Sequence, residues 1–255
     1  MRFVAAALTD RGIVKESNQD CLCFIQAETM RGPAALAMVC DGMGGLQKGE
    51  VASAAVTRLF AQWFETQFPA QIEAFDWRGV IAQWEQMVQD AARRLEHYGA
   101  RTGVRLGTTL TAMLMFEGHY LIVHVGDSRV YEITDTLTQI TEDQTLVARE
   151  ARQGLITPEQ AEHDLRRNVL LQCVGASATV RPAMITGTLR TNATYLFCSD
   201  GLRHEVSPQE LFNFTNPGVS VGKDAMQRNL AELVNVVKQR GEEDNLSALL
   251  VRVMD

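Results

Sequence analysis

The sequence has little positive charge and no long hydrophobic run. Its 255 residues carry 24 Lys and Arg against 31 Asp and Glu, a formal net charge of −7 at pH 7. Nucleic acid and anionic membranes both need a basic face, so neither is expected as a partner. No apolar run approaches the roughly 18 residues that span a bilayer. The short apolar run at residues 3–8 is expected to be a first strand rather than a signal peptide.

Cysteine is scarce, and no two of the five cysteines have Cys-x-x-Cys spacing. Cys40, Cys173 and Cys198 lie inside apolar runs, which is typical of reduced thiols, so a cytoplasmic location is expected. Cys21 and Cys23 would point to the same face of a strand. A soft-metal pair is one interpretation of them, and two small buried side chains are the simpler one.

The motifs of several enzyme classes are missing. No cysteine is followed six positions later by arginine, and neither a Gly-x-Ser-x-Gly elbow nor a His-Glu-x-x-His zinc motif occurs. The glycine-rich segment 41–50 has Gln47 where a dinucleotide fingerprint needs glycine, and Glu50 where a P-loop needs lysine. These absences exclude a cysteine-based phosphatase, a serine hydrolase of the elbow type, a zincin and the two common nucleotide folds.

What the sequence does have is a set of aspartates beside apolar runs. Runs of this composition predict buried strands. Carboxylates at strand ends are half withdrawn from water and repel one another unless a cation neutralises them. Oxygen ligands alone indicate Mg²⁺ or Mn²⁺ rather than zinc. The acids and the runs they adjoin are Asp41 after 36–40, Asp127 after 121–125, Asp200 after 195–199, and Asp244 before 246–253.

Periodicity predicts the order of the elements. Amphipathic helices are expected at 50–68 and 78–98, where apolar residues recur at three- and four-residue steps. After them come three strands that are predicted to form one antiparallel meander. The later elements are a strand, a helix opening at Ser207, a longer helix and a last strand. The strands of the meander are 108–116, 119–124 and 130–133. The later strand is 194–198, the longer helix 224–240 and the last strand 246–253.

The segment 141–168 is polar and helical in tendency. Gly154 is the expected C-cap of a first short helix, and Thr157 with Gln160 is the expected capping box of a second. We interpret this segment as a surface excursion from the sheets rather than a separate domain. With strands before and after the helices, the prediction is one domain of sheet packed on sheet with helices outside.

Taken together and in this order, the motifs resemble those of the metal-dependent protein serine/threonine phosphatases of type 2C (the PPM family) in their compact bacterial form. The resemblance covers residues 5–253. It rests on Thr9-Asp10, Lys15, Asn18-Gln19-Asp20, Asp41-Gly42-Met43-Gly44-Gly45, Gly49-Glu50, Gly107-Thr108-Thr109, Gly126-Asp127-Ser128-Arg129, Ser199-Asp200-Gly201-Leu202 and Glu243-Asp244-Asn245.

The resemblance implies an α+β fold, an αββα sandwich of two packed antiparallel sheets flanked by helices, in a single catalytic domain over 1–255. A metal cleft would lie at one end of the sheets, with the helical flap at about 141–168 beside it. Two Mn²⁺ or Mg²⁺ ions, or three, are implied. Asp41 would bridge two ions with help from the Gly42 carbonyl, and the remaining ligands would be Asp200 and Asp244 at the first ion, Asp20 at the second, and Asp127 with Asp200 at a third.

The implied activity is hydrolysis of phosphoserine and phosphothreonine by direct attack of a metal-bridging hydroxide, without a phosphoenzyme. The substrates would be phosphorylated proteins made by a serine/threonine kinase, and the chain is expected to be a monomer. Two alternatives stay open. One is a catalytically weak phosphatase-like module that binds or senses a ligand, and the other is a different two-metal hydrolase.

Three residues depart from the family pattern. Lys15 stands where bacterial relatives carry an arginine that grips the substrate phosphate, so weaker substrate binding is expected unless Lys15 is an ordinary surface lysine. Met43 stands where eukaryotic relatives often have a histidine acid. His163 in the flap is the nearest candidate to contact substrate and protonate the leaving group, although Asp164 replaces the usual proline. A solvated flap histidine is the alternative.

Overall fold

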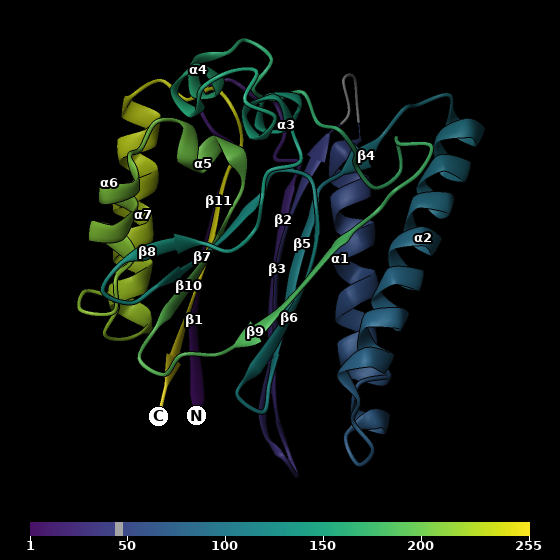
Figure 1. The fold of residues 1–255 in the computed structure, drawn as a ribbon, viewed down its shortest axis with the longest axis vertical. Coiled ribbons are helices and arrows are strands. Elements are labelled where there is room, and N and C mark those ends of the chain that lie inside the picture. The colour runs from purple at the N-terminus through teal and green to yellow at the C-terminus, as the bar shows by residue number, and fades with distance from the viewer. Residues whose placement is uncertain (44–47) are drawn as a thin grey trace.

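A computed structural model describes residues 1–43 and 48–255. Residues 44–47, which include Gly44 and Gly45 of the expected motif, lie outside the described residues. Two antiparallel sheets face one another, and helices cover the outer face of each (Figure 1). The expected αββα sandwich is confirmed.

The first sheet has five strands in the order β1-β11-β10-β7-β8, with antiparallel neighbours throughout. The first and last strands of the described chain, β1 and β11, therefore lie side by side. The strands are β1 (Arg2–Asp10), β7 (Arg129–Ile133), β8 (Leu137–Gln139), β10 (Thr194–Cys198) and β11 (Leu246–Met254).

The second sheet has the order β2-β3-β5-β6-β9, with the short β4 paired to the end of β3. All its pairs are antiparallel as well. Its strands are β2 (Asp20–Thr29), β3 (Gly32–Met43), β4 (Gly107–Thr108), β5 (Leu110–Phe116), β6 (His119–Val125) and β9 (Ala183–Thr188).

Helices form the outer layers. The second sheet is covered by α1 (Gly49–Thr66) and α2 (Trp77–Thr102), which are joined through the short 3₁₀ helix η1 (Pro69–Gln71), and the first sheet by α5 (Asp200–His204), α6 (Pro208–Thr215) and α7 (Lys223–Gln239) (Figure 1). Two short helices, α3 (Leu146–Arg152) and α4 (Pro158–His163), lie above the strand ends within the expected flap. No helix in residues 1–43 and 48–255 is both long and apolar enough to cross a membrane.

The core is divided into three apolar layers. One lies between the second sheet and helices α1 and α2, where Phe60, Trp63 and Trp84 pack edge to face. The middle layer lies between the sheets and includes Tyr195 and Phe197. The third lies between the first sheet and α5 to α7. Strands buried on both faces explain why the sequence shows continuous apolar runs instead of alternation.

The prediction of a single meander was wrong at its third strand. Strand β5 does pair with β6, but β7 belongs to the other sheet, between β10 and β8. The edge of β6 is taken by β9, which the sequence analysis did not predict. Gly126, at φ +110°, begins the crossing from one sheet to the other. The crossing segment also carries Asp127.

The predicted helix caps are present in the structure. The Thr157 hydroxyl accepts a hydrogen bond from the Gln160 backbone, and the Gln160 side chain reciprocates, so the capping box of α4 is confirmed. Ser207 and Glu210 make the same exchange at α6. Gly154 and Gly241 follow α3 and α7 with positive φ angles, as C-terminal glycines do.

Candidate metal centre

Two acids face one another where β2 begins and β3 ends. Asp20 and Asp41 are direct partners in the antiparallel register of these strands. Like charges directly opposite on a sheet are destabilising. The Oδ2 atom of Asp20 is buried and has no hydrogen-bond partner among residues 1–43 and 48–255. A buried carboxylate oxygen without a partner is costly, so this end of the sheet fits a cation.

The backbone around Asp41 is held from both sides. The Thr109 hydroxyl accepts a hydrogen bond from the Asp41 amide at 2.8 Å, and the Thr109 amide donates to the Asp41 carbonyl at 2.8 Å. Next to it, a Cβ atom on Gly42 would lie 2.3 Å from the carbonyl oxygen of Gly49. Only glycine permits this close backbone approach. The backbone of Asp41 and Gly42 is thereby fixed beside the first turn of α1.

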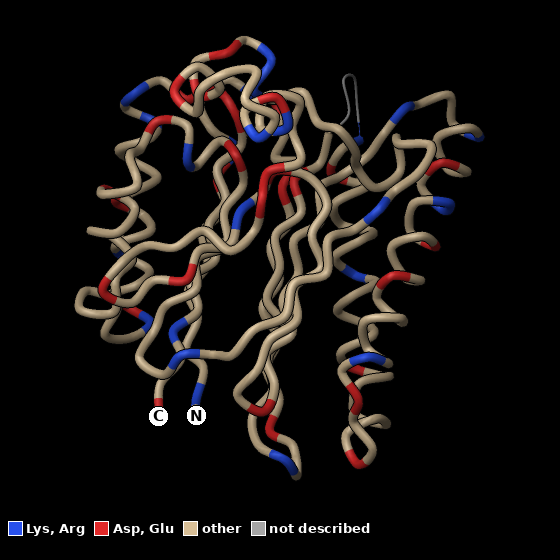
Figure 2. The backbone as a smooth tube through the Cα atoms, viewed as in Figure 1, with Lys and Arg blue, Asp and Glu red and all other residues tan. Residues whose placement is uncertain are grey.

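Asp200 and Asp244 reach the same edge from the other sheet. Asp200 is the first residue of α5, directly after β10, and Asp244 lies just before β11. A Cβ atom on Gly201 would lie 2.4 Å from the Asn245 carbonyl oxygen, so the start of α5 packs directly on the segment that carries Asp244. Figure 2 shows acidic residues gathered at the upper ends of the central strands.

Asn245 is a positioning residue that sequence reasoning did not single out. Its side-chain oxygen accepts from the Gln19 amide at 2.9 Å, and its amide group donates to the carbonyls of Arg11 at 2.8 Å and Ser17 at 3.1 Å. It therefore ties the loop between β1 and β2 to the start of β11. Its place within the Glu243-Asp244-Asn245 motif was the available signal.

Lys15 lies on that loop and pairs with one of the acids. Its Nζ lies 2.9 Å from Oδ1 of Asp244, with the lysine side chain 45% exposed. Burial opposes the charged form, but the hydrogen bond to Asp244 and the charges of Asp41 and Asp200 outweigh it, so the pKa of Lys15 is raised. The lysine stays charged at the solvent side of the acids.

The pKa values of the acids are shifted by burial and by the nearness of the other acids. Burial, followed by the charges of Asp20, Asp200, Asp127 and Asp244, raises the pKa of Asp41 well above its ordinary value. Burial also raises the pKa of Asp20 to about 7, with further contributions from Asp200 and Asp244. Carboxylates with such pKa values hold protons when no cation is present and release them to one.

The arrangement suits hard ions that keep water ligands. Within residues 1–43 and 48–255, no three His, Cys, Asp or Glu side chains are gathered tightly enough to hold an ion by themselves. Mg²⁺ is usually bound through one or two carboxylates and retains several waters. Acids spread along two sheet ends, one with an unpaired oxygen, fit that mode better than a closed zinc-type site.

Asp127 has a different environment from the other acids. It is 4% exposed, and an Arg203 nitrogen, Nη2, lies 3.6 Å from its Oδ2. Burial and the charge of Asp200 raise the pKa of Asp127 to about 8, and Arg203 opposes the shift. Sequence reasoning did not predict Arg203, although it follows the Asp200-Gly201-Leu202 motif directly.

His204 is a second neighbour that the sequence analysis missed. It ends α5, and its side chain is 7% exposed. Its Nδ1 lies 3.5 Å from Oε2 of Glu242 and its Nε2 lies 4.0 Å from Oδ2 of Asp200. Burial favours neutral Glu242, but the hydrogen bond from His204 holds the pKa of that glutamate below its usual value. The buried imidazole therefore lies between Glu242 and Asp200.

The expected flap histidine is not brought to the acids. His163 is the last residue of α4 and is exposed. In the described part of the chain, no hydrogen bond or ion pair connects it to Asp20, Asp41, Asp200 or Asp244.

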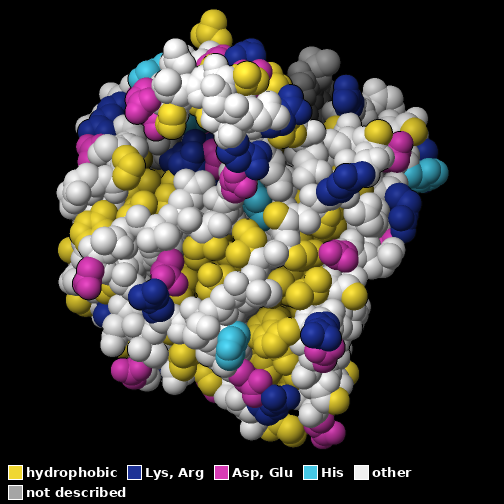
Figure 3. Space-filling model, viewed as in Figure 1, with side chains coloured by type: hydrophobic (Ala, Val, Ile, Leu, Met, Phe, Trp, Pro, Cys, Tyr) yellow, Lys and Arg dark blue, Asp and Glu magenta, His cyan; other side chains and the backbone are white. Residues whose placement is uncertain are grey.

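On the face in Figure 3, charged side chains gather in the upper part around α3 and α4, and hydrophobic ones across the middle.

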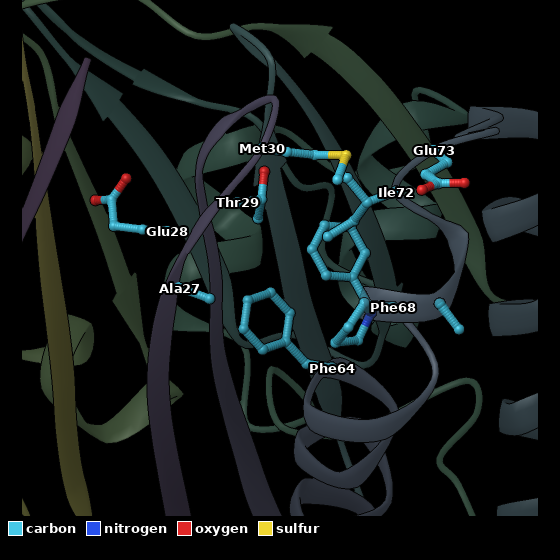
Figure 4. A pocket seen from close by; sticks show the side chains of 10 residues that line it. Ala27, Glu28, Thr29, Met30, Phe64, Phe68, Ile72 and Glu73 are labelled. Atoms are coloured by element: carbon cyan, nitrogen blue, oxygen red, sulfur yellow. The ribbon is translucent and has the colours of Figure 1, made fainter.

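A cavity of about 380 Å³ lies elsewhere, between the β2–β3 hairpin and the end of α1. Figure 4 shows the rings of Phe64 and Phe68 facing the hairpin, with the carboxylate of Glu28 pointing away. The hairpin turn joins the ends of β2 and β3 that are opposite to Asp20 and Asp41. This pocket is mainly apolar and is separate from the acids.

Comparison with known proteins agrees with the geometry. Residues 13–250 match the family model described as protein phosphatase 2C. The serine/threonine phosphatase stp of Listeria welshimeri is 31% identical over 248 residues, which is 95% of this chain and 93% of the relative.

Solved structures show the same fold. The serine/threonine phosphatase Stp1 of Staphylococcus aureus superposes with a TM-score of 0.85 at 27% identity, covering 100% of this chain and 96% of that one. The catalytic domain of the phosphatase PstP, in complex with two manganese ions, gives a TM-score of 0.80 at 28% identity and covers 99% of both chains. The chain therefore belongs to the protein phosphatase 2C family of metal-dependent serine/threonine phosphatases.

Proposed function

We propose that Asp20, Asp41, Asp200 and Asp244, with the carbonyl of Gly42, hold two Mn²⁺ or Mg²⁺ ions and that this centre hydrolyses phosphoserine and phosphothreonine in proteins. One observation carries the proposal. Acids from two different sheets meet at one edge, where burial and mutual repulsion raise the pKa of Asp41 and of Asp20. The manganese pair bound by the relative PstP supports this choice of ions.

Two such ions, when bound, lower the pKa of a water molecule and stabilise the charge of the reacting phosphoryl group. The protein's own contribution is to hold the ligands rigidly. Thr109 fixes the backbone of Asp41, and the packing of Gly201 on Asn245 fixes Asp200 against Asp244. Ligands that are already in place need little reorganisation during the reaction.

Lys15 and His163 are proposed to face the substrate. The ammonium group of Lys15 is close to Asp244 and partly exposed, so it can bind phosphate at the solvent side of the acids. His163 lies exposed on α4, and we assign it to contact with the phosphopeptide rather than to proton transfer. An unchanged KM in His163→Ala would refute that assignment.

We also propose one catalytic domain over 1–255, with the flap at 141–168, acting as a monomer in the cytoplasm. The three apolar core layers share the two sheets, which supports a single unit. The cysteines are free thiols, in keeping with a reducing compartment. The partners would be phosphoproteins made by a serine/threonine kinase, and neither nucleic acid nor membrane.

The direct test is phosphate release from a phosphothreonine peptide with Mn²⁺, with and without chelator. The native chain should be active only with metal. Asp200→Asn should lower kcat/KM by on the order of 10²-fold or more, because a metal ligand contributes several kcal/mol to the transition state. Asp224→Asn, which changes an exposed acid on α7, is the matched control. If the native chain is inactive both with and without Mn²⁺, it is instead a binding module.

A further inference from the structure

Arg203 is a largely buried cation next to Asp127. It lies on α5, three residues after Asp200, and its side chain is only 12% exposed. Its Nη2 lies 3.6 Å from Oδ2 of Asp127 and donates to the Asp127 carbonyl oxygen at 3.4 Å. Buried guanidinium groups are rare unless they are paired, so the burial of Arg203 depends on its acidic partners.

A second acid holds Arg203 in place. The same Nη2 lies 3.3 Å from Oδ2 of Asp143. Asp143 is itself gripped by Arg129, through Nε at 2.8 Å and Nη2 at 2.7 Å. A two-pronged contact of this kind fixes orientation as well as charge. Arg203 cannot swing away from Asp127 without leaving Asp143.

The four side chains form one contact network. Asp127, Asp143, Arg129 and Arg203 are two acids and two bases, and each acid has a guanidinium within ion-pair distance. Arginine is not deprotonated in proteins, so the positive charge of Arg203 is permanent. A divalent ion on Asp127 would face this fixed positive charge at close range.

Here the expected ligand set does not fit. The family resemblance assigns a third ion to Asp127 with Asp200, but Arg203 already lies against Asp127. We propose that Arg203 supplies from within the chain the positive charge that a third ion would bring, so that the centre holds two divalent ions. This inference rests on the proposed metal centre. It makes Arg203 a positioning residue that sets the number of ions bound.

The test is the stoichiometry of bound Mn²⁺, measured by equilibrium dialysis and metal analysis up to millimolar free Mn²⁺. The native chain and Asp127→Asn should both bind two ions. Arg203→Gln should bind an additional, weaker ion, and the double variant Arg203→Gln/Asp127→Asn should return to two. A merely structural arginine would alter stability and leave the stoichiometry unchanged.

Arg190→Gln is the matched control, since Arg190 pairs with Glu132 by an exposed side chain, and it should bind two ions. If the native chain binds three ions and Asp127→Asn binds two, the inference is overturned while the metal centre stands. If a folded Arg203→Gln binds only two, the inference also fails. A native chain that binds fewer than two refutes the metal centre itself. Should Arg203→Gln not fold, the native chain and Asp127→Asn still decide.

Discussion

At the scale of single residues, Lys15 pairs with Asp244 and is proposed to bind the substrate phosphate. Its ammonium is 2.9 Å from a carboxylate oxygen of Asp244, and it also occupies the position where the family carries its phosphate-binding arginine. An ammonium is a point charge with rotatable donors, whereas arginine presents a planar fork that matches phosphate. Lysine can therefore serve phosphate, but with less geometric selection than the family's arginine.

We expect Lys15→Ala to lower kcat/KM for a phosphothreonine peptide by about 10- to 100-fold, mainly through KM. A charge-assisted hydrogen bond contributes roughly 1.5–3 kcal/mol, and its loss from ground state and transition state alike raises KM. Lys15→Arg should lower KM, because a two-pronged contact replaces a single one.

Steady-state kinetics of these two variants, with Lys223→Ala as the control at an exposed lysine, measure the effect. If Lys15→Ala retains the native kcat/KM, Lys15 is an ordinary surface lysine.

At the scale of elements, the loop between β1 and β2 depends on the far end of the chain. Asn245, directly before β11, makes three hydrogen bonds to this loop, and it is 4% exposed. Gly12, at φ +78°, packs against the Asp244 carbonyl at a distance that no Cβ atom would permit. The loop that carries Lys15 is thus shaped by the segment that carries Asp244.

Asn245→Ala should reduce the free energy of unfolding by about 2–3 kcal/mol, because three part-buried hydrogen bonds are lost and their backbone partners are left unpaired. It should also raise KM, since Lys15 loses its support. Urea denaturation measures the first effect and peptide kinetics the second.

Asn229→Ala is the comparison, because the half-buried Asn229 makes one side-chain hydrogen bond, to the Val219 carbonyl. Equal losses in the two variants would show that Asn245 has no special role.

Elements differed in how well the sequence predicted them. The long helices and the caps at Thr157 and Ser207 depend on local spacing and local hydrogen bonds, so they were predicted closely. Strand β7 was assigned to the wrong sheet, because its partner β10 lies more than 60 residues away. Strand β9 is only half-buried and lacks a strong apolar pattern, so it was not predicted.

At the scale of the whole molecule, the metal-free fold carries an electrostatic cost. The acids come from both sheets, and folding brings them together where burial and mutual repulsion raise their pKa values. The folded-state pKa of Asp20, about 7, and of Asp127, about 8, both exceed the ordinary value of 3.8. The folded chain therefore binds more protons than the unfolded chain between about pH 4 and pH 8.

In chelator, we expect Tm to fall by on the order of 5–10 °C between pH 5 and pH 8.5. Raised acid pKa values give stability that is present at low pH and is lost as pH rises through the folded-state pKa, and about 1 kcal/mol shifts Tm by roughly 2–4 °C at this size. Adding Mn²⁺ should restore Tm most at high pH, where no proton competes.

Thermal melting with and without chelator follows this change, and Asp20→Asn should flatten the dependence. A Tm that is constant or rises over this range without metal would contradict the gathering of the acids.

The sequence by itself determined the chemistry of the site, since aspartates beside apolar runs and a glycine after Asp41 can be recognised from local composition and order. It also indicated the sandwich of sheets and helices. Only the tertiary structure decided the contacts: the pairing of Lys15 with Asp244, the tie made by Asn245 and the placement of Arg203 against Asp127. These join residues that are far apart along the chain, and such contacts depend on how the two sheets pack, which local spacing does not encode.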